Sequence, residues 1–141
     1  PPGDAERWLR GLPVEPQKPP ERVHFAIVER GSSELIGSIG LTVSARHNHA
    51  EAGYWLGRPY WNRGYMTEAL RAVLEYGFTE LGLHRIYATY FPENPASLRV
   101  MEKAGMRYEG TLREHYRRDG VYRDSGYCGI LRADWEAMQE G

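Results

Sequence analysis

The junction between a predicted strand and the most regular predicted helix carries the first residues that could do chemistry, at positions 60–67. The first backbone N–H groups of a helix lack an intrahelical acceptor, and the helix dipole adds positive partial charge there. Gly64 would let a pyrophosphate approach, and Arg58 and Arg63 could add charge-assisted contacts. The junction therefore indicates a phosphate cradle, with an ordinary glycine before a helix as the alternative. The P-loop and Gly-x-Gly-x-x-Gly fingerprints are absent.

Hydrophobic periodicity predicts the elements around this junction. Asn94 and Pro95 form an N-cap followed by a proline at the first helical position, and Asp119-Gly120 predicts a two-residue type I′ turn. Ranges in which apolar residues alternate with others are predicted to be strands, and ranges in which they recur three and four residues apart are predicted to be helices. Strands are predicted over 23–29, 35–43, 49–56, 85–90, 106–116 and 121–131, and helices over 66–81, 94–105 and, as a last turn, 135–139. This order predicts an α/β (α+β) fold, a mixed sheet with helices packed on it.

Residues 1–22 differ from the rest of the chain. Prolines stand at positions 1, 2, 13, 16, 19 and 20, around one short helical candidate at 4–12. We expect this segment to be peripheral, or a remnant of something longer, and residues 23–141 to form the domain.

Composition limits the partners. The 141 residues fit one domain, and 18 basic against 19 acidic residues disfavour nucleic acid as a bulk partner. The single Cys128 excludes an intramolecular disulfide framework and a cysteine-rich zinc site. No apolar run approaches the ~18 residues of a membrane span, and no signal-peptide pattern opens the sequence. We therefore expect a cytoplasmic protein without a membrane partner.

Two further groups have plain explanations. His47 and His49 could share one strand face, but no third ligand has convincing spacing, so we expect surface residues and no metal site. Several arginines flank the predicted 119–120 turn, and a solvated hairpin is the expected explanation, with recruitment of an acidic substrate or RNA as the alternative. These arginines are Arg113, Arg117, Arg118 and Arg123.

Four linked segments resemble one known family. They cover positions 51–57 (EAGYWLG), 60–70 (YWNRGYMTEAL), 81–86 (LGLHRI) and 92–106 (PENPASLRVMEKAGM). In this order and spacing they resemble the GNAT superfamily of acyl-CoA N-acyltransferases, and within it the RimJ/RimL-like branch of ribosomal-protein-alanine N-acetyltransferases. The resemblance extends over roughly residues 23 to 131.

The resemblance implies a mixed, mostly antiparallel sheet in which the strand over 49–56 splays from the strand over 85–90. Acetyl-CoA, the co-substrate, would lie between them, with Leu56 and Gly57 near its pantetheine arm and Asn94 facing that arm or serving only as a helix cap. Trp61 is usual in the branch, whereas the bulk of Met66 departs from the family and is expected to narrow the groove. The family's first strand is not evident before residue 23. The implied pyrophosphate cradle is the backbone of Asn62, Arg63, Gly64, Tyr65, Met66 and Thr67.

Amide formation requires a neutral amine and a stabilised thiolate, so the site needs a proton acceptor and a hydrogen-bond donor. Glu51 shares a strand face with Gly53, beside the implied thioester, and matches the family's general base; it could instead be an exposed carboxylate or orient substrate through water. Ser97, third in its helix, could meet the thiolate or only satisfy the first turn. Tyr116, at the hairpin end, is the alternative acid.

Together these features predict an acetyl-CoA-dependent N-acetyltransferase acting by direct transfer in a ternary complex, with no covalent intermediate at Cys128. The resemblance favours the α-amine at a protein or peptide N-terminus as acceptor, a ribosomal protein included. A small-molecule amine such as an amino sugar or polyamine, a non-catalytic acyl-CoA-binding sensor, and an RNA- or ribosome-associated module are the alternatives. The oligomeric state is left open, a homodimer included.

Overall fold

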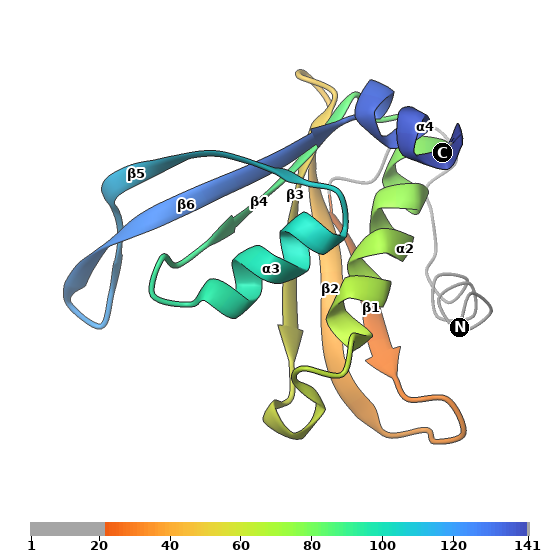
Figure 1. Ribbon diagram of the computed structural model, residues 1–141, viewed down its shortest axis with the longest axis horizontal. Coiled ribbons are helices and arrows are strands. Elements are labelled where there is room, and N and C mark those ends of the chain that lie inside the picture. Colours follow the sequence, from red (N-terminus) through yellow and green to blue (C-terminus); the bar gives the residue numbers. More distant parts are fainter. Residues whose placement is uncertain (1–21, 141) are drawn as a thin grey trace.

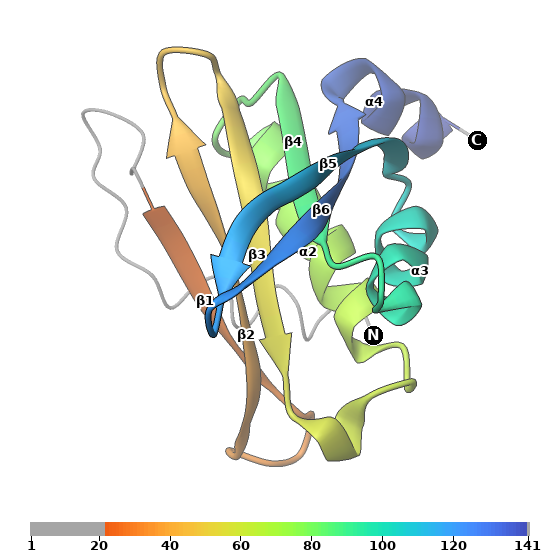
Figure 2. The ribbon, with the colours of Figure 1, turned by 90° about the vertical axis from the view of Figure 1, so that its left-hand side faces the viewer.

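A six-stranded sheet with helices against one face forms the protein, shown by a computed structural model that describes residues 22–140 (Figures 1 and 2). The strands are β1 (Arg22–Val28), β2 (Leu35–Ser44), β3 (His49–Leu56), β4 (Arg85–Tyr90), β5 (Arg107–Arg118) and β6 (Val121–Leu131). The helices are η1 (Arg58–Tyr60), α2 (Tyr65–Thr79), α3 (Pro95–Lys103) and α4 (Arg132–Glu140). This is the predicted order; the candidate helix at 4–12 lies outside the described residues.

The sheet is mixed and mostly antiparallel, as predicted. Its strand order is β1-β2-β3-β4-β6-β5. Only β3 and β4 pair in parallel, and every other neighbouring pair is antiparallel. Because β3 and β4 are parallel, α2 crosses between them along one face of the sheet. In the described range no helix is long and apolar enough to cross a membrane.

The core lies between the sheet and α2. Alternating residues of β1 and β2 point toward the helix, and Phe25, Ile39 and Leu41 among them are at most 2% exposed. α2 buries the stripe that its three- and four-residue spacing predicted. Its buried residues are Met66, Ala69, Leu70, Ala72, Val73, Leu74, Gly77 and Phe78. This packing fixes the position of the α2 N-terminus relative to β3.

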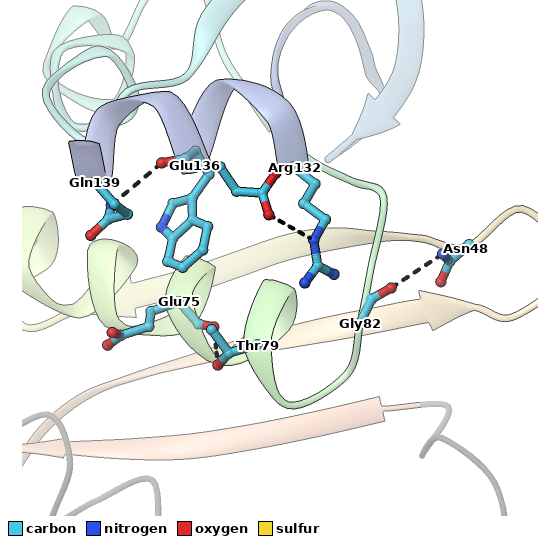
Figure 3. A network of polar contacts seen from close by, with 8 residues as sticks. Asn48, Glu75, Thr79, Gly82, Arg132, Glu136 and Gln139 are labelled. Carbon is cyan, nitrogen blue, oxygen red and sulfur yellow. Dashed lines mark hydrogen bonds and ion pairs between the residues drawn. The ribbon is translucent and has the colours of Figure 1, made fainter. Parts of the chain in front are cut away.

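The C-terminal end of α2 is fixed by polar contacts (Figure 3). The helix ends at Thr79, two residues before the predicted end, and the hydroxyl of Thr79 donates to the Glu75 carbonyl at 2.7 Å. Gly82 follows in the left-handed region with φ 64°, and its carbonyl accepts a hydrogen bond from the Asn48 side chain at 3.2 Å. A glycine is favoured at such a position because it carries no Cβ.

The C-terminal helix is longer than the single predicted turn. α4 spans nine residues, with an ion pair between Arg132 and Glu136 one turn apart (Figure 3). Its Trp135 ring packs against Phe78 with 5.6 Å between ring centroids. The helix begins three residues before the predicted turn, where the Asp134 carboxylate accepts a hydrogen bond from the Leu131 N–H at 3.1 Å.

The β5–β6 hairpin has the predicted turn but a less regular ladder. Asp119 and Gly120 have φ values of 52° and 76°, as a type I′ turn requires. The register shifts twice along β5, between residues 108 and 110 and between 112 and 116. At the second shift Glu114 adopts a φ of 46°, and its N–H donates to the Asp124 carboxylate at 2.8 Å. The hairpin is therefore antiparallel as predicted, with two irregularities in β5 that the strand pattern did not indicate.

Gly77 allows the close approach of α2 to the sheet. A Cβ added there would lie 2.7 Å from Ile86 Cδ1 and 3.2 Å from Leu41 Cδ1. Gly77→Val should therefore lower the free energy of unfolding by about 1–3 kcal/mol through overpacking, measured by urea denaturation. Ala133→Val, on the exposed face of α4, is the control and should cost less than about 0.7 kcal/mol. Equal losses would mean that the helix does not pack as described.

Candidate active site

β3 and β4 are paired over only part of their length. The parallel register ends at Ala52 and Ala88, whereas β3 continues to Leu56 and β4 to Tyr90. Figure 1 shows the two strands diverging toward these ends. Residues 53–56 keep their pairing with β2 but have no strand on their other edge in the described structure. This opening confirms the expected splay, and its free edge can pair with an extended ligand as an exposed sheet edge pairs with a peptide.

The chain leaves β3 and, after η1, enters α2 through an open N-terminus. Gly64 is the N-cap with φ 80°, no side chain caps this end, and a Cβ on Gly64 would have no atom within 4 Å. The first N–H groups of α2 are thus available to an anion. The phosphate cradle at residues 62–67 stays a prediction with which this open N-terminus is compatible.

The side chains in and before the cradle contact other parts of the protein. The Arg58 and Arg63 guanidinium groups lie over aromatic rings, at 5.4 Å from Trp61 and 5.8 Å from Tyr60. The indole N–H of Trp61 donates to the Leu56 carbonyl at 2.7 Å, which ties the loop to the end of β3. The Met66 side chain is 6% exposed and packs in the core. The expected narrowing of the groove by Met66 is therefore not seen, and only its backbone can contact an anion.

The remaining cofactor candidates border the opening. Asn94 stands at the N-cap position of α3, before Pro95, but its side chain is exposed and makes no capping hydrogen bond. It is therefore not committed to capping. The Leu56 side chain is buried, and the Gly57 N–H donates to the Ile36 carbonyl at 2.8 Å.

Glu51 and Gly53 lie on the face of β3 opposite the helices, since Ala52 and Leu56 are buried on the helix side. Gly53 pairs with Gly40 of β2 without a register shift. A Cβ on Gly53 would meet no atom within 4 Å. The glycine therefore marks open space beside Glu51 and not a bulge.

A row of four aromatic rings extends from Glu51 across the open face. His49 of β3, Tyr87 of β4, Tyr127 of β6 and His115 of β5 follow one another with centroid distances of 5.6, 5.9 and 6.1 Å. The Tyr87 hydroxyl donates to Glu51 Oε1 at 3.5 Å, a long hydrogen bond. Burial, and then the charge of Glu51, raise the pKa of Tyr87. This aromatic row lines the open face beside the carboxylate with two imidazole and two phenol rings.

Two hydroxyl groups meet on the helix side of the opening. Ser97 is the third residue of α3, as predicted, and its Oγ lies 2.9 Å from the Tyr54 Oη. Tyr54 lies on β3 two residues beyond Ala52, where pairing with β4 ends. Burial raises the pKa of Tyr54, so its phenol is protonated at neutral pH.

Tyr116 lies at the open end of β4. Its ring stacks on Phe91, which follows β4, with 4.8 Å between ring centroids. Its hydroxyl oxygen is buried and has no hydrogen-bond partner among the described residues. A buried hydroxyl without a partner is unusual, and the role of Tyr116 as an alternative acid stays a prediction.

Cys128 and the histidines are not arranged for covalent or metal chemistry. Cys128 is fully buried in β6, and burial raises the pKa of its thiol to about 11. The His47 and His49 rings lie 5.4 Å apart. Within residues 22–140, no three histidine, cysteine or carboxylate side chains are grouped to hold a metal ion.

Most of the hairpin arginines have partners inside the protein. Three of them make cation–π contacts with two aromatic rings or an ion pair with one carboxylate. These contacts leave their guanidinium groups less available to an external partner. The contacts are Arg117 over Tyr122, Arg118 over Phe91, and Arg123 with Glu93 at 2.9 Å.

The structure brings the candidate base and the candidate thiolate partner to one opening but on opposite faces of the sheet. Glu51 faces the aromatic row, and Ser97 faces α2 and Tyr54. Sequence reasoning did not single out Tyr54, although strict alternation from Gly53 places it on the helix side. Tyr87 was also missed, because its position beside Glu51 depends on the parallel register of two distant strands.

Comparisons with known proteins agree with this geometry. The family described as "Acetyltransferase (GNAT) domain" matches residues 1–107. A probable N-acetyltransferase, YjcK of Bacillus subtilis, is 40% identical over 118 residues, which cover 82% of this chain and 65% of that protein. The uS5-alanine N-acetyltransferase of Escherichia coli is 29% identical over 89% of this chain and 66% of its own.

Among solved structures, a mutant of the spermidine N-acetyltransferase SpeG from Vibrio cholerae has a TM-score of 0.77 at 27% identity. The match covers 84% of this chain and 70% of that chain. The chain spans about two thirds of the length of the proteins it matches, 65% in the case of YjcK.

Cys128, the single cysteine of the sequence, can be used to test the burial of β6. With a pKa of about 11, only about 0.1% of the thiol is thiolate at pH 8. Iodoacetamide should therefore label the native protein far more slowly than the urea-unfolded protein, as followed by intact mass. Labelling of the native protein within minutes would show that β6 is accessible here.

Proposed function

The chain belongs to the acetyltransferase (GNAT) domain family, and from this we propose that it transfers the acetyl group of acetyl-CoA directly to a primary amine. The preferred acceptor is the α-amine at the N-terminus of a protein or peptide. Both substrates are bound together, and no covalent enzyme intermediate forms. The buried and protonated thiol of Cys128 supports direct transfer.

The observation that carries the proposal is the opening between β3 and β4. It has a free strand edge for the amides of a pantetheine arm and, where β3 leads into α2, an uncapped helix N-terminus for a pyrophosphate. Leu56 and Gly57 link the two features, and Asn94 lies at the start of α3. The thioester would then lie between the Glu51 face and the Ser97 face.

The residues divide the reaction between the two faces. The amine nitrogen attacks the thioester carbonyl, a C–N bond forms and the C–S bond breaks. Glu51 accepts the amine proton on the aromatic-row side, and the Ser97 hydroxyl donates a hydrogen bond to the departing thiolate on the helix side. Tyr87 helps to orient the carboxylate through its long hydrogen bond to Glu51.

An α-amine suits such a site. Its pKa is near 7.7–8.0 against about 10.4 for lysine, so freeing it of a proton at neutral pH costs roughly 3 to 4 kcal/mol less. A carboxylate such as Glu51 can then act as the base. The relative that acts on ribosomal protein uS5 supports this choice.

A small-molecule amine is the second candidate, because the SpeG structure belongs to a spermidine N-acetyltransferase. A polycation would favour several unpaired carboxylates. Beside Glu51, however, the described face presents the aromatic row, and Glu109 of β5 is already bound by Arg85 through two hydrogen bonds of 2.6 and 2.7 Å. These contacts favour an acceptor with one amine over a polyamine.

The cradle can be tested by ligand-induced stabilisation. Acetyl-CoA should raise the melting temperature of the protein, because it binds only the native state. Gly64→Asp puts a carboxylate at the pyrophosphate position and should abolish the rise. Gly120→Asp is the matched control, since Gly120 also has a positive φ of 76° and open space around its Cα. Without ligand, Gly120→Asp should lower the melting temperature about as much as Gly64→Asp does. With acetyl-CoA, it should show the same rise in melting temperature as the unchanged protein. A flat melting temperature in the unchanged protein would contradict the proposal.

The acceptor and the base can be tested together. Labelled acetyl-CoA is offered with free peptides, polyamines and aminoglycosides, and we expect transfer to peptide N-termini. Glu51→Gln should then lower the rate roughly 10²- to 10⁴-fold and flatten the acidic limb of the pH profile, with the acetyl-CoA melting shift unchanged.

Glu34→Gln, on an exposed turn, is the control and should keep full activity. Activity of Glu51→Gln within about threefold would assign the base elsewhere. Turnover of a small amine without any peptide would refute the preferred acceptor and keep the enzyme class.

A further inference from the structure

The hydrogen bond between Tyr54 and Ser97 spans the opening on its helix side. The two oxygens are 2.9 Å apart, and the residues are 43 positions apart in the chain. Tyr54 extends from β3, and Ser97 belongs to the first turn of α3, which follows β4. The bond therefore joins the two elements that the splay separates.

Counting protons shows what this pair can do. Each hydroxyl carries one proton and two acceptor lone pairs. One hydrogen bond between them uses one proton, whichever oxygen donates, and the described residues offer no other hydrogen-bond partner to either hydroxyl. One hydroxyl proton thus remains for a further acceptor in the opening.

General chemistry favours Tyr54 as the donor within the pair, although the geometry allows either oxygen to donate. A phenol is more acidic than an aliphatic alcohol and is therefore the better hydrogen-bond donor. When Tyr54 donates to Ser97, one lone pair of the serine oxygen is engaged, and the serine proton is directed elsewhere, at a helix N-terminus that favours negative charge.

We propose that Tyr54 is a positioning residue that, by donating a hydrogen bond to Ser97, directs the serine proton toward the sulfur of coenzyme A. This inference rests on the proposed function. As the C–S bond breaks, the electron pair stays on sulfur, and the Ser97 hydroxyl donates a hydrogen bond to that thiolate. Tyr54 does not touch the sulfur, and it acts through Ser97.

Free coenzyme A provides a test that needs no acceptor. The pKa of its thiol is measured free and bound in the same buffer, and a donor aimed at the sulfur should lower the pKa of the bound thiol by about one unit. The titration is followed by the ultraviolet absorbance of the thiolate, with the acetyl-CoA complex as the baseline. Cys128 is present in both complexes, so its own titration, with a pKa of about 11, cancels in the difference.

Removing either hydroxyl should have the same effect. Tyr54→Phe and Ser97→Ala should each lose at least half of the shift in the thiol pKa, and the double variant should lose no more than Ser97→Ala alone, because Tyr54 acts only through Ser97. In turnover, Tyr54→Phe should lower kcat about tenfold with the KM for acetyl-CoA unchanged. Urea unfolding checks that each variant folds, and Tyr54→Met is a second variant without the hydroxyl.

Tyr76→Phe is the matched control. Tyr76 is a half-buried tyrosine of α2 whose pKa is also raised by burial, and its ring packs on Phe25, away from the opening. Its loss of a hydroxyl should leave the thiol pKa and kcat unchanged.

The outcomes separate this inference from the proposed function. A thiol pKa in Tyr54→Phe equal to that of the unchanged protein, or losses that add in the double variant, would overturn the role of Tyr54. Normal binding of coenzyme A without a lowered thiol pKa would overturn it too, with the acetyltransferase proposal intact. Failure of the unchanged protein to bind coenzyme A would overturn both the role of Tyr54 and the proposed function.

Discussion

The short parallel contact between β3 and β4 is the constraint on which the site depends. β3 pairs with β2 along all eight of its residues, and β4 pairs with β6 along all six of its own. The sheet is therefore two antiparallel units that share only the pairs up to Ala52 and Ala88. Because strands twist, two units joined at one end separate at the other. The candidate site is the space that this separation creates.

Contacts outside the sheet hold the two units in this arrangement. The packing of α2, made close by Gly77, fixes the cradle against the β2–β3 side. On the other side, the Glu93–Arg123 ion pair and the stack of Phe91 on Tyr116 join the β4–α3 loop to the hairpin. The Tyr54–Ser97 hydrogen bond is then a direct side-chain link across the gap.

Local sequence patterns predicted the elements well because local physics determines them. Alternation gave β3 and β4 with their correct ends, and Asn94-Pro95 and Asp119-Gly120 marked a helix start and a turn. The packing of Trp135 on Phe78 and the hydrogen bond from the Glu114 N–H to Asp124 join residues that are distant in the sequence, so both needed the tertiary structure. The same holds for the site. Glu51 was proposed from its strand face and the family resemblance, and Ser97 from its place in the first turn of a predicted helix, whereas the positions of Tyr54 and Tyr87 beside them depend on the pairing of strands distant in the sequence.

The alternation of side chains along β3 has an evolutionary consequence. Ala52 and Leu56 belong to the core, and Tyr54 packs against it. Glu51, Gly53 and Trp55 point to the open face, and Trp55 is 60% exposed. Substitutions at Gly53 and Trp55 can therefore change the open surface while the packing on the helix side is preserved. If the proposed function holds, evolution can vary one face of this strand independently of the other.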